Sequence, residues 1–398
     1  MILFIVLTSS ISSTLIYWTT PHDLHQRFDS ALEKVIASYS LVYEISRDIE
    51  TLRGMRFSDY ATILVVDTSW ALKTWAPKED SEIPSELVYR ETLYKLTFLL
   101  PYNKSILQKQ REWIGMFAAA TAGTTLYINI DYFNPYTEEA RNVLAHELTH
   151  VLQSLYFRIH TPQTLDARLA VLALVEGDAG WTQHLYCNNT GMCKPSPPMM
   201  LNLEDLYISL NLFPYIFGER FVKFLYDKGG WGLVNRAYEK PPKSTLMVLK
   251  PEIYLDYLVN GTDVVLNVEI KPNENLSCLY SDVLGPYYVM LVLANIIGIE
   301  KALDIALNWR GDKALLCQVT NNTKPMFVAV WNTTWSSDSY AMNFYNNLTY
   351  MIQQRGYVNE MNTEKRIGVI VVSESSRHVI AMSVKGSNVC IESYLTQD

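Results

Sequence analysis

The chain has 398 residues, with 33 Lys and Arg against 41 Asp and Glu, so its formal net charge is −8. Hydrophobic residues make up 49% of the chain, which is enough to bury a sizeable core and excludes global disorder. A nucleic-acid-binding protein needs a concentrated basic face to neutralise phosphates, so the acidic balance argues against that class.

The first segment of the chain indicates export. Residues 1–18 carry no charge and contain an apolar block, Ile2 to Leu7, followed by a Ser- and Thr-rich stretch. This length fits the hydrophobic part of a signal peptide better than a full membrane span, although the usual basic residues before it are missing. We therefore expect residues 1–20 to be a signal peptide or a membrane anchor. A buried first strand or helix is the alternative.

Hydrophobic periodicity predicts the elements that follow. Apolar residues recur at helical spacing over residues 22–56, which predicts a long helix. Tyr60 to Val66 and Thr124 to Ile130 are rich in β-branched and aromatic residues and are predicted strands. Two helical segments follow, at about 137–158 and 165–186.

The C-terminal half is more mixed. A stretch punctuated by Gly and Pro covers residues 227–252, and residues 285–307 are predicted to form an apolar core helix. Ile367 to Val372 and His378 to Val384 are predicted to be a closing pair of strands. The expected fold class is α+β, with a mainly helical C-terminal part that ends in β-strands.

Glycosylation triplets and cysteines also favour an exported protein. Cys187 and Cys193 bracket a turn-like loop that a local disulfide would close. Cys278 and Cys317 could form a second pair, which leaves Cys390 over. Seven Asn-x-Ser/Thr triplets exceed the roughly three expected by chance from this composition, although unmodified Asn-rich loops are an alternative source. The triplets begin at Asn103, Asn188, Asn260, Asn275, Asn321, Asn332 and Asn347.

The most informative motif is His146-Glu-Leu-Thr-His150. On a helix, positions i and i+4 lie one above the other, so both histidines can reach one cation. The apolar residues of this segment lie on nearly the opposite face and can pack into a core while the histidines face a cleft. Glu147 is placed to reach a metal-bound water without being a ligand itself. The apolar stripe consists of Leu144, Leu148, Val151, Leu152 and Leu155.

A third protein ligand is expected, because catalytic zinc normally has three ligands plus an open water position. Glu176 ends a run of seven apolar residues, 169–175, that is predicted to be a buried helix. A carboxylate there would be costly to desolvate unless it were paired or bound to a metal. The alternative is that Glu176 ends the buried stretch and turns to solvent at Gly177.

The sequence resembles the gluzincin metallopeptidases, and within that class a group of exported, poorly characterised zinc proteases. The resemblance rests on Leu144–Gln153, followed by Ala173–Ala179, and it extends over most of the chain from about residue 25. Lys250 departs from the pattern, because a His would be expected there, and this puts the role of its loop in doubt. The further motifs are Pro214-Tyr215, Gly218, Phe221, Gly229-Gly230-Trp231, Ala237-Tyr238, Pro241–Thr245, Tyr254 and Trp309–Asp312.

The resemblance implies a zincin-like core with a small mixed sheet. It implies that His146, His150 and Glu176 bind Zn²⁺ and that Glu147 is the general base on the zinc-bound water. It also implies a Tyr or His that stabilises the oxyanion, and Tyr215 is the first candidate. The second candidate is His184, and Asp178 is a weak candidate for orienting a ligand histidine.

The same resemblance suggests a substrate and a subdivision of the chain. Thr124 to Ile130 could be the edge strand along which an extended peptide binds, or an ordinary member of the sheet. The stretch at Gly115 lacks the glutamate of gluzincin aminopeptidases, which favours an endopeptidase. The expected parts are an N-terminal helix and sheet subdomain (21–135), a zinc-binding helical subdomain (136–255) and a mixed, glycosylated C-terminal region (256–398).

Two other classes of function remain open at this point. One is a surface glycoprotein that keeps the fold, and even the zinc, but uses the cleft only for binding. The other is a structural component of the cell envelope in which the histidines are fortuitous. Hydrolysis of a non-peptide amide or ester would use the same constellation of residues.

Overall fold

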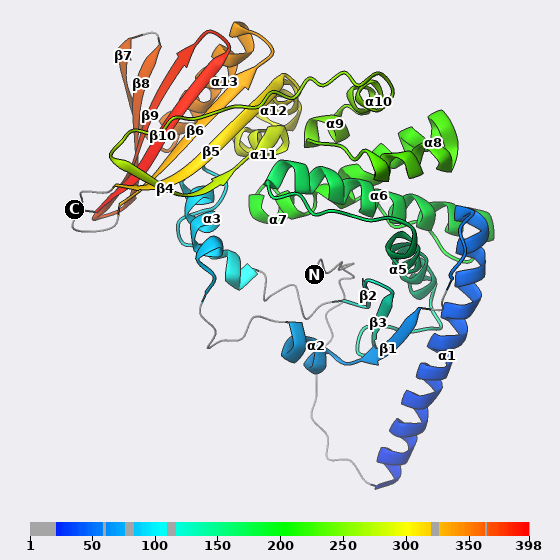
Figure 1. Cartoon of the computed structure of the whole chain (residues 1–398). Helices are drawn as coiled ribbons and strands as arrows, with labels where there is room; N and C mark the ends of the chain where they lie inside the picture. Colours follow the sequence, from blue (N-terminus) through cyan, green and yellow to red (C-terminus); the bar gives the residue numbers. More distant parts are fainter. Residues whose placement is uncertain are drawn as a thin grey trace.

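The computed structural model describes residues 21–58, 61–75, 83–109, 117–319, 326–362 and 364–397. The expected signal peptide or anchor at residues 1–20, the triplet at Asn321 and the stretch at Gly115 lie outside these residues. Within them the chain is a mixed α+β protein with a small mixed sheet and a larger antiparallel sheet (Figure 1).

The N-terminal part consists of a long helix beside a three-stranded sheet. The strand order is β1-β3-β2, in which β1 is parallel and β2 antiparallel to β3. Apolar residues of the long helix, of this sheet and of α5 share one core. The elements are α1 (Pro21–Arg53), β1 (Thr62–Val66), α2 (Thr68–Trp75), α3 (Ser85–Leu96), β2 (Ala119–Ala122) and β3 (Thr125–Asn129).

The strand predicted at Thr124 to Ile130 exists as β3, and of the two roles left open for it the structure shows the ordinary sheet member rather than the edge strand. It lies between β1 and β2, so both of its sides are occupied. The edge beside α5 belongs to β2, which pairs only with β3 among the described strands. Four residues of small side chains, Ala-Ala-Thr-Ala, gave too little β-branched or aromatic signal to predict β2.

Helices fill the middle of the molecule (Figure 1). The segments predicted at 137–158 and 165–186 are α5 and α6, and α8 crosses α6. Gly229 and Gly230 have non-helical dihedral angles, so α8 consists of two helical segments joined at a kink. The elements are α5 (Glu138–Tyr156), α6 (Leu165–Thr190), α7 (Leu206–Asn211), α8 (Phe213–Glu239), α9 (Thr245–Leu249) and α10 (Pro251–Asn260).

The C-terminal part was expected to be mainly helical, and this expectation is wrong. It is built on a seven-stranded antiparallel sheet. Its strand order is β4-β5-β6-β10-β9-β8-β7. Buried and less buried residues alternate along β9, so one face of the sheet is buried; α3, α11 and α13 pack on the sheet. The strands are β4 (Leu276–Asp282), β5 (Trp309–Val319), β6 (Phe327–Trp335), β7 (Gly356–Asn362), β8 (Lys365–Ser373), β9 (Ser376–Lys385) and β10 (Asn388–Gln397).

The helices of this part also differ in detail from the expectation. The predicted apolar helix 285–307 is divided at Gly298, whose φ of 83° is a left-handed backbone conformation that favours glycine. Pro286 stands at the first turn of the first half, where its missing N–H leaves no hydrogen bond unmade. The helices are α11 (Gly285–Ile297), α12 (Ile299–Ala306) and α13 (Asp338–Gln353).

Three buried aspartates, which we call the acid junction, join the middle helices to the C-terminal sheet. Asp282, at the end of β4, accepts hydrogen bonds from the Leu165 N–H at the start of α6 and from its neighbour Val283. Asp166 accepts from the N–H and hydroxyl of Thr245 at the start of α9. Asp312 completes the junction on β5.

Asp312 accepts three hydrogen bonds, from the N–H groups of Leu284 and Gly285 at the start of α11 and from the Trp331 indole. Each aspartate thus satisfies N–H groups at a different helix N-terminus, which a helix cannot pair internally. These contacts explain two sequence motifs that carried no mechanism, Pro241–Thr245 and Trp309–Asp312.

Candidate metal centre

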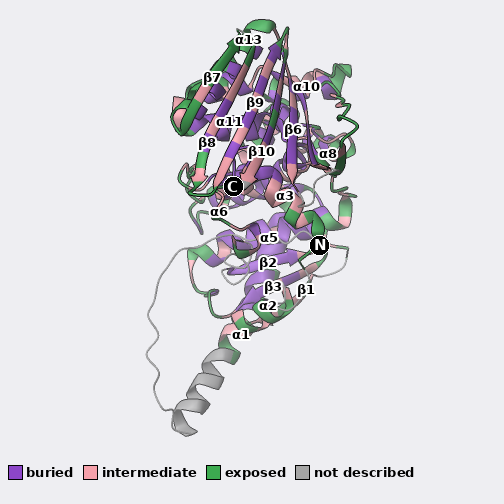
Figure 2. Cartoon of the chain, turned by 90° about the vertical axis from the view of Figure 1, so that its left-hand side faces the viewer, coloured by how far each residue is buried: buried purple, intermediate pink, exposed green. Residues whose placement is uncertain are grey.

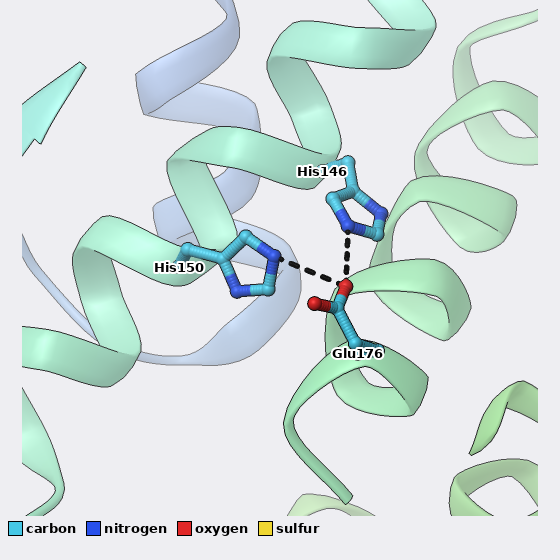
Figure 3. A group of neighbouring side chains, drawn as sticks. All are labelled: His146, His150 and Glu176. Atoms are coloured by element: carbon cyan, nitrogen blue, oxygen red, sulfur yellow. Dashed lines mark hydrogen bonds and ion pairs between the residues drawn. The ribbon is translucent and has the colours of Figure 1, made fainter. Parts of the chain in front are cut away.

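The candidate centre lies between α5 and α6. Thr137 accepts a hydrogen bond from the Ala140 N–H and begins α5, which carries His146 and His150 one turn apart. Glu176 lies in the middle of α6 and points at both rings (Figure 3). The histidine face of one helix therefore meets the glutamate face of the next.

The three side chains converge on one point. Glu176 Oε2 lies 3.1 Å from Nε2 of His146 and 3.4 Å from Nε2 of His150. One potential ligand atom from each residue falls within 4.8 Å of the others. Two imidazole nitrogens and a carboxylate oxygen are a donor set that suits a divalent metal such as zinc. The structure thus brings together the three residues that the sequence singles out.

The histidines are buried, and the cleft expected beside them stays a prediction. Neither they nor Glu147 nor Glu176 is more than 4% exposed. The leucine stripe of α5 packs into the core with α1 and the small sheet, and the opposite face is covered by α6. Residues 142–153 of α5 are all buried, and a view coloured by burial shows the middle of the molecule around α5 largely buried (Figure 2).

Glu147 has a different environment from that of Glu176. Neither oxygen of its carboxylate has a hydrogen-bond partner within the described part of the chain. Burial raises the pKa of this carboxyl, and the two histidines only partly oppose that effect. Its backbone carbonyl accepts a hydrogen bond of 3.1 Å from the Thr121 hydroxyl, which ties this turn of α5 to the edge strand β2. A buried acceptor without a donor is expensive, so this position fits a carboxylate that serves a ligand or a water.

The ligand residues carry opposite pKa shifts. Burial by itself would raise the pKa of Glu176, but His150 and His146 outweigh it and hold that pKa at about 2. Burial would lower the pKa of His150, but the Glu176 carboxylate outweighs it and raises that pKa to about 9. A proton between His150 and Glu176 therefore stands where a cation would bind, and a metal must displace it.

Each histidine is supported on its other ring nitrogen by a glutamine. His150 Nδ1 lies 2.8 Å from Gln153 Oε1, and the Gln153 amide donates to the Val175 carbonyl and to Asp178. Since both of those groups are acceptors, the amide nitrogen must face them and the amide oxygen must face His150. His150 then carries a proton on Nδ1 and presents Nε2 to the candidate metal site.

Asp178, the weak candidate for orienting a histidine, reaches His150 only through Gln153. Arg53 at the end of α1 holds Asp178 by a two-pronged ion pair with both distances 3.0 Å, and Tyr238 donates to it at 2.8 Å. The Arg53 guanidinium also lies 4.1 Å from the centre of the Trp231 ring. The long N-terminal helix is thus tied to the centre by a buried, paired charge.

Tyr215 lies against the ligand set because α6 and α8 approach closely. Its hydroxyl donates to Glu176 Oε1 at 3.1 Å, leaving Oε2 to face the histidines. A Cβ on Gly177 would lie 2.1 Å from the Gly218 carbonyl oxygen, so the crossing needs glycine at this point. His184, the second oxyanion candidate, is about one-third exposed and pairs with Glu219 at 3.0 Å.

Two supporting residues were missed in the sequence. Arg53 and Gln183 carried no motif, although Gln183 lies seven residues after Glu176 and so shares its face of α6. A search for polar residues at that spacing on the ligand helix would have found Gln183. Arg53 could not be found in this way, because it lies 125 residues before its partner.

Comparison with known proteins adds one finding. A protein-family model described as the eCIS core domain matches residues 114–156, which contain β2, β3 and all of α5. The match includes His146, Glu147 and His150 and ends before Glu176. No curated protein matches the chain.

Proposed function

We propose that the protein is an exported zinc metallopeptidase of gluzincin type that hydrolyses peptide bonds. The observation that carries the proposal is the pairing of a buried His146, His150 and Glu176 cluster with Glu147, a buried carboxylate that has no donor among the described residues. The match to the eCIS core domain and the resemblance to gluzincins are compatible with it.

The residues have separate roles in this proposal. His146, His150 and Glu176 hold the metal, and a bound zinc would polarise the scissile carbonyl and acidify the attacking water. Glu147 takes the proton from that water and later gives it to the leaving amine. A pKa raised by burial suits the first step, because the carboxylate is then a stronger base toward that water. Tyr215 holds Glu176, and an oxyanion role for its phenol remains a prediction.

The substrate we propose is an extended peptide laid along β2. This strand forms an edge of the small sheet. Its Thr121 hydroxyl donates a hydrogen bond to the backbone carbonyl of Glu147. Backbone pairing with an edge strand recognises a peptide without regard to most of its side chains. Endopeptidase activity is part of the same proposal.

Glu147→Gln tests the mechanism. The variant is expected to keep about one zinc per chain and to lose about 10²–10⁴-fold in peptide hydrolysis, the usual contribution of a general base. The control is Glu139→Gln, an exposed glutamate on the same helix, which should change neither quantity. Hydrolysis that survives in Glu147→Gln would refute the role of the base, and a well-folded wild type that binds no zinc would refute the metal centre.

A second function is favoured by the burial of the site. Structural zinc sites are closed, whereas catalytic ones keep an open position, and no residue of this cluster is more than 4% exposed. On this basis the chain would be a catalytically inactive zinc-binding or structural cell-surface glycoprotein. Cobalt in place of zinc distinguishes the two: a hydroxamate inhibitor should change the visible spectrum of an open site and leave a closed one unaltered.

Export is supported by the disulfides. Cys187–Cys193 and Cys278–Cys317 are both formed, as the sequence analysis expected, and Cys390 is free. Extracellular proteins retain such bonds, whereas the cytosol reduces them. Among the helices of the described residues, none is long and apolar enough to cross a membrane.

Glycosylation is the remaining part of the export proposal. Of the described triplets, four begin at exposed asparagines, which are Asn103, Asn188, Asn260 and Asn275. Asn332 and Asn347 lie half-buried in β6 and α13 and are poorer acceptors. The mass of the native protein tests the proposal, since a mass equal to that of the bare chain would refute it.

A further inference from the structure

The hydrogen bonds that hold His146 differ from those that hold His150. They continue through neighbouring side chains to the loop closed by the Cys187–Cys193 disulfide. His146 Nδ1 lies 3.0 Å from Gln183 Oε1, and the Gln183 amide nitrogen donates to Asn142 Oδ1 and, at 3.0 Å, to the Ser196 hydroxyl. Asn142 in turn donates to the Lys194 carbonyl at 3.1 Å and to Ser196 at 2.9 Å. Two residues that follow the Cys187–Cys193 disulfide thus hold the support of a metal ligand.

A backbone carbonyl fixes the direction of this whole chain of hydrogen bonds. The Lys194 carbonyl can only accept, so the Asn142 amide nitrogen must face it and the Asn142 oxygen must face Gln183. Gln183 then donates to Asn142 and presents its oxygen to His146. His146 therefore carries its proton on Nδ1 and presents the lone pair of Nε2 to the metal site.

The disulfide sets the position of that carbonyl. Helix α6 ends at Gly191, which has a left-handed φ of 65°, and the chain turns back so that Cys193 bonds to Cys187 in the last turn. Both cysteines are buried, and Cys187 Sγ lies 3.6 Å from Asn142 Oδ1. Lys194 is the next residue after the bond, so it has little freedom to move while the bond is intact.

The other histidine has no such link. Gln153, which supports His150, is held by the Val175 carbonyl and by Asp178, and both lie inside α6. Asp178 is fixed by Arg53 of α1 rather than by a covalent bond. The two halves of the centre are therefore supported independently, one by packed helices and one by a closed loop.

We propose that Gln183 is a positioning residue for His146 and that the Cys187–Cys193 disulfide sets the metal affinity through Asn142 and Gln183. The inference rests on the proposed metal centre, but not on any catalytic activity. With the bond open, the Lys194 carbonyl and the Ser196 hydroxyl leave Asn142, and the Gln183 amide loses the groups that orient it. His146 then no longer holds Nε2 ready for the metal.

Zinc affinity of the full chain, measured by competition with a chelating dye, tests this inference. Opening the loop by Cys187→Ser with Cys193→Ser should weaken zinc binding about 10–100-fold, the range seen when the outer support of a metal ligand is lost. The matched control is Cys278→Ser with Cys317→Ser, which removes the bond between β4 and β5 and should leave zinc binding unchanged. Equal affinity in folded proteins with and without the Cys187–Cys193 bond would overturn the proposal.

Variants of Gln183 separate positioning from a general loss of structure, and they keep the disulfide. Gln183→Ala should weaken binding as much as opening the loop, and combining the two changes should add nothing further, because both act along one path. Gln183→Glu retains an acceptor for Nδ1 but cannot donate to Asn142, so it should bind zinc more tightly than Gln183→Ala and should no longer respond to opening of the loop. Additive losses, or no rescue by Glu, would refute the path. A wild type that binds no zinc would instead refute the proposed metal centre.

Discussion

The protein buries two groups of carboxylates, and they are held by different kinds of partner. In the acid junction, the first group, Asp166 and Asp312 are fully buried and receive hydrogen bonds from helix N-termini, hydroxyls and an indole. In the metal centre, the second group, Glu176 is balanced by two histidines and Glu147 has no donor among the described residues. Carboxylates that are equally buried therefore differ in whether hydrogen-bond donors or histidines surround them.

The pKa shifts reflect this difference. In the acid junction, burial outweighs the hydrogen bonds and raises the pKa of Asp166 to about 7 and that of Asp312 to about 6. In the candidate metal centre only Glu176 differs, because the histidines outweigh burial and hold its pKa at about 2, whereas burial raises the pKa of Glu147 as it does in the acid junction. A buried acid whose oxygens are used by the backbone is a structural element, whereas one without a donor marks a place for a ligand.

The largest effect is expected from Asp312→Ala, which tests whether the acid junction stabilises the fold. It removes the only acceptor that we identify for three buried donors, the N–H groups of Leu284 and Gly285 and the Trp331 indole. At about 1–3 kcal/mol for each of the three unsatisfied groups, the free energy of unfolding should fall by about 3–9 kcal/mol. Urea denaturation measures this.

The control for Asp312→Ala is Ser337→Ala, which removes the half-buried N-cap of α13 and should lose only about 1 kcal/mol. If the two variants were equally stable, the acid junction would not be the structural element that we describe. Zinc content, measured on whatever fraction folds, should be unchanged in both, because neither residue touches the metal centre.

The sequence predicted the metal centre better than the rest of the fold. Residues His146 and His150 lie one helical turn apart, so their meeting depends only on local geometry. Glu176 was found because a charge ending an apolar run is unusual and needs a partner. The burial of the site could not be predicted, since it depends on which face of α6 covers α5.

The large sheet and the acid junction show what sequence patterns leave out. β5 and β6 are buried in part on both faces, so they lack the alternation that revealed β8 and β9. Asp166 and Asp312 lie 146 positions apart, and nothing local pairs them. The position of β3 inside its sheet could not be predicted, because pairing order in a sheet is set by tertiary contacts rather than by strand propensity.

The acid junction should also give the protein a distinctive pH dependence. The folded-state pKa of Asp166 lies above its unfolded value, so the folded protein keeps a proton that the unfolded chain releases between about pH 4 and pH 7. Stability should therefore fall as pH rises through this window, by up to about 1.4 kcal/mol per pH unit from this group. Asp166→Asn, which mimics the protonated form, should flatten the slope in urea denaturation at successive pH values. An identical slope in both proteins would show that Asp166 is ionised in the fold.

Gly177→Ala tests whether the close crossing of α6 and α8 positions Glu176 in the candidate metal centre. The added Cβ would lie 2.1 Å from a backbone oxygen of α8, so the two helices must separate and carry Glu176 away from Tyr215. We expect a loss of about 1–3 kcal/mol in stability, as for other overpacked contacts, together with weaker zinc binding. Gly180→Ala, one turn along the same helix, meets only a side chain at 3.6 Å and is the matched control. Zinc affinity unaffected by Gly177→Ala would show that the crossing does not position the ligand.

The smallest effect is expected from Tyr215→Phe. This variant tests whether the Tyr215 hydroxyl, which donates to Glu176 Oε1, holds the ligand in place or takes part in the reaction. Loss of this hydrogen bond to a charged oxygen should lower zinc affinity by about 1–2 kcal/mol, which is roughly 10-fold. If the phenol instead stabilises the oxyanion, zinc affinity should stay the same while kcat falls. Zinc titration and single-turnover hydrolysis on the same variant separate the two roles. An unchanged zinc affinity would mean that Glu176 is held by the histidines alone, as a carboxylate balanced by charge rather than by donors.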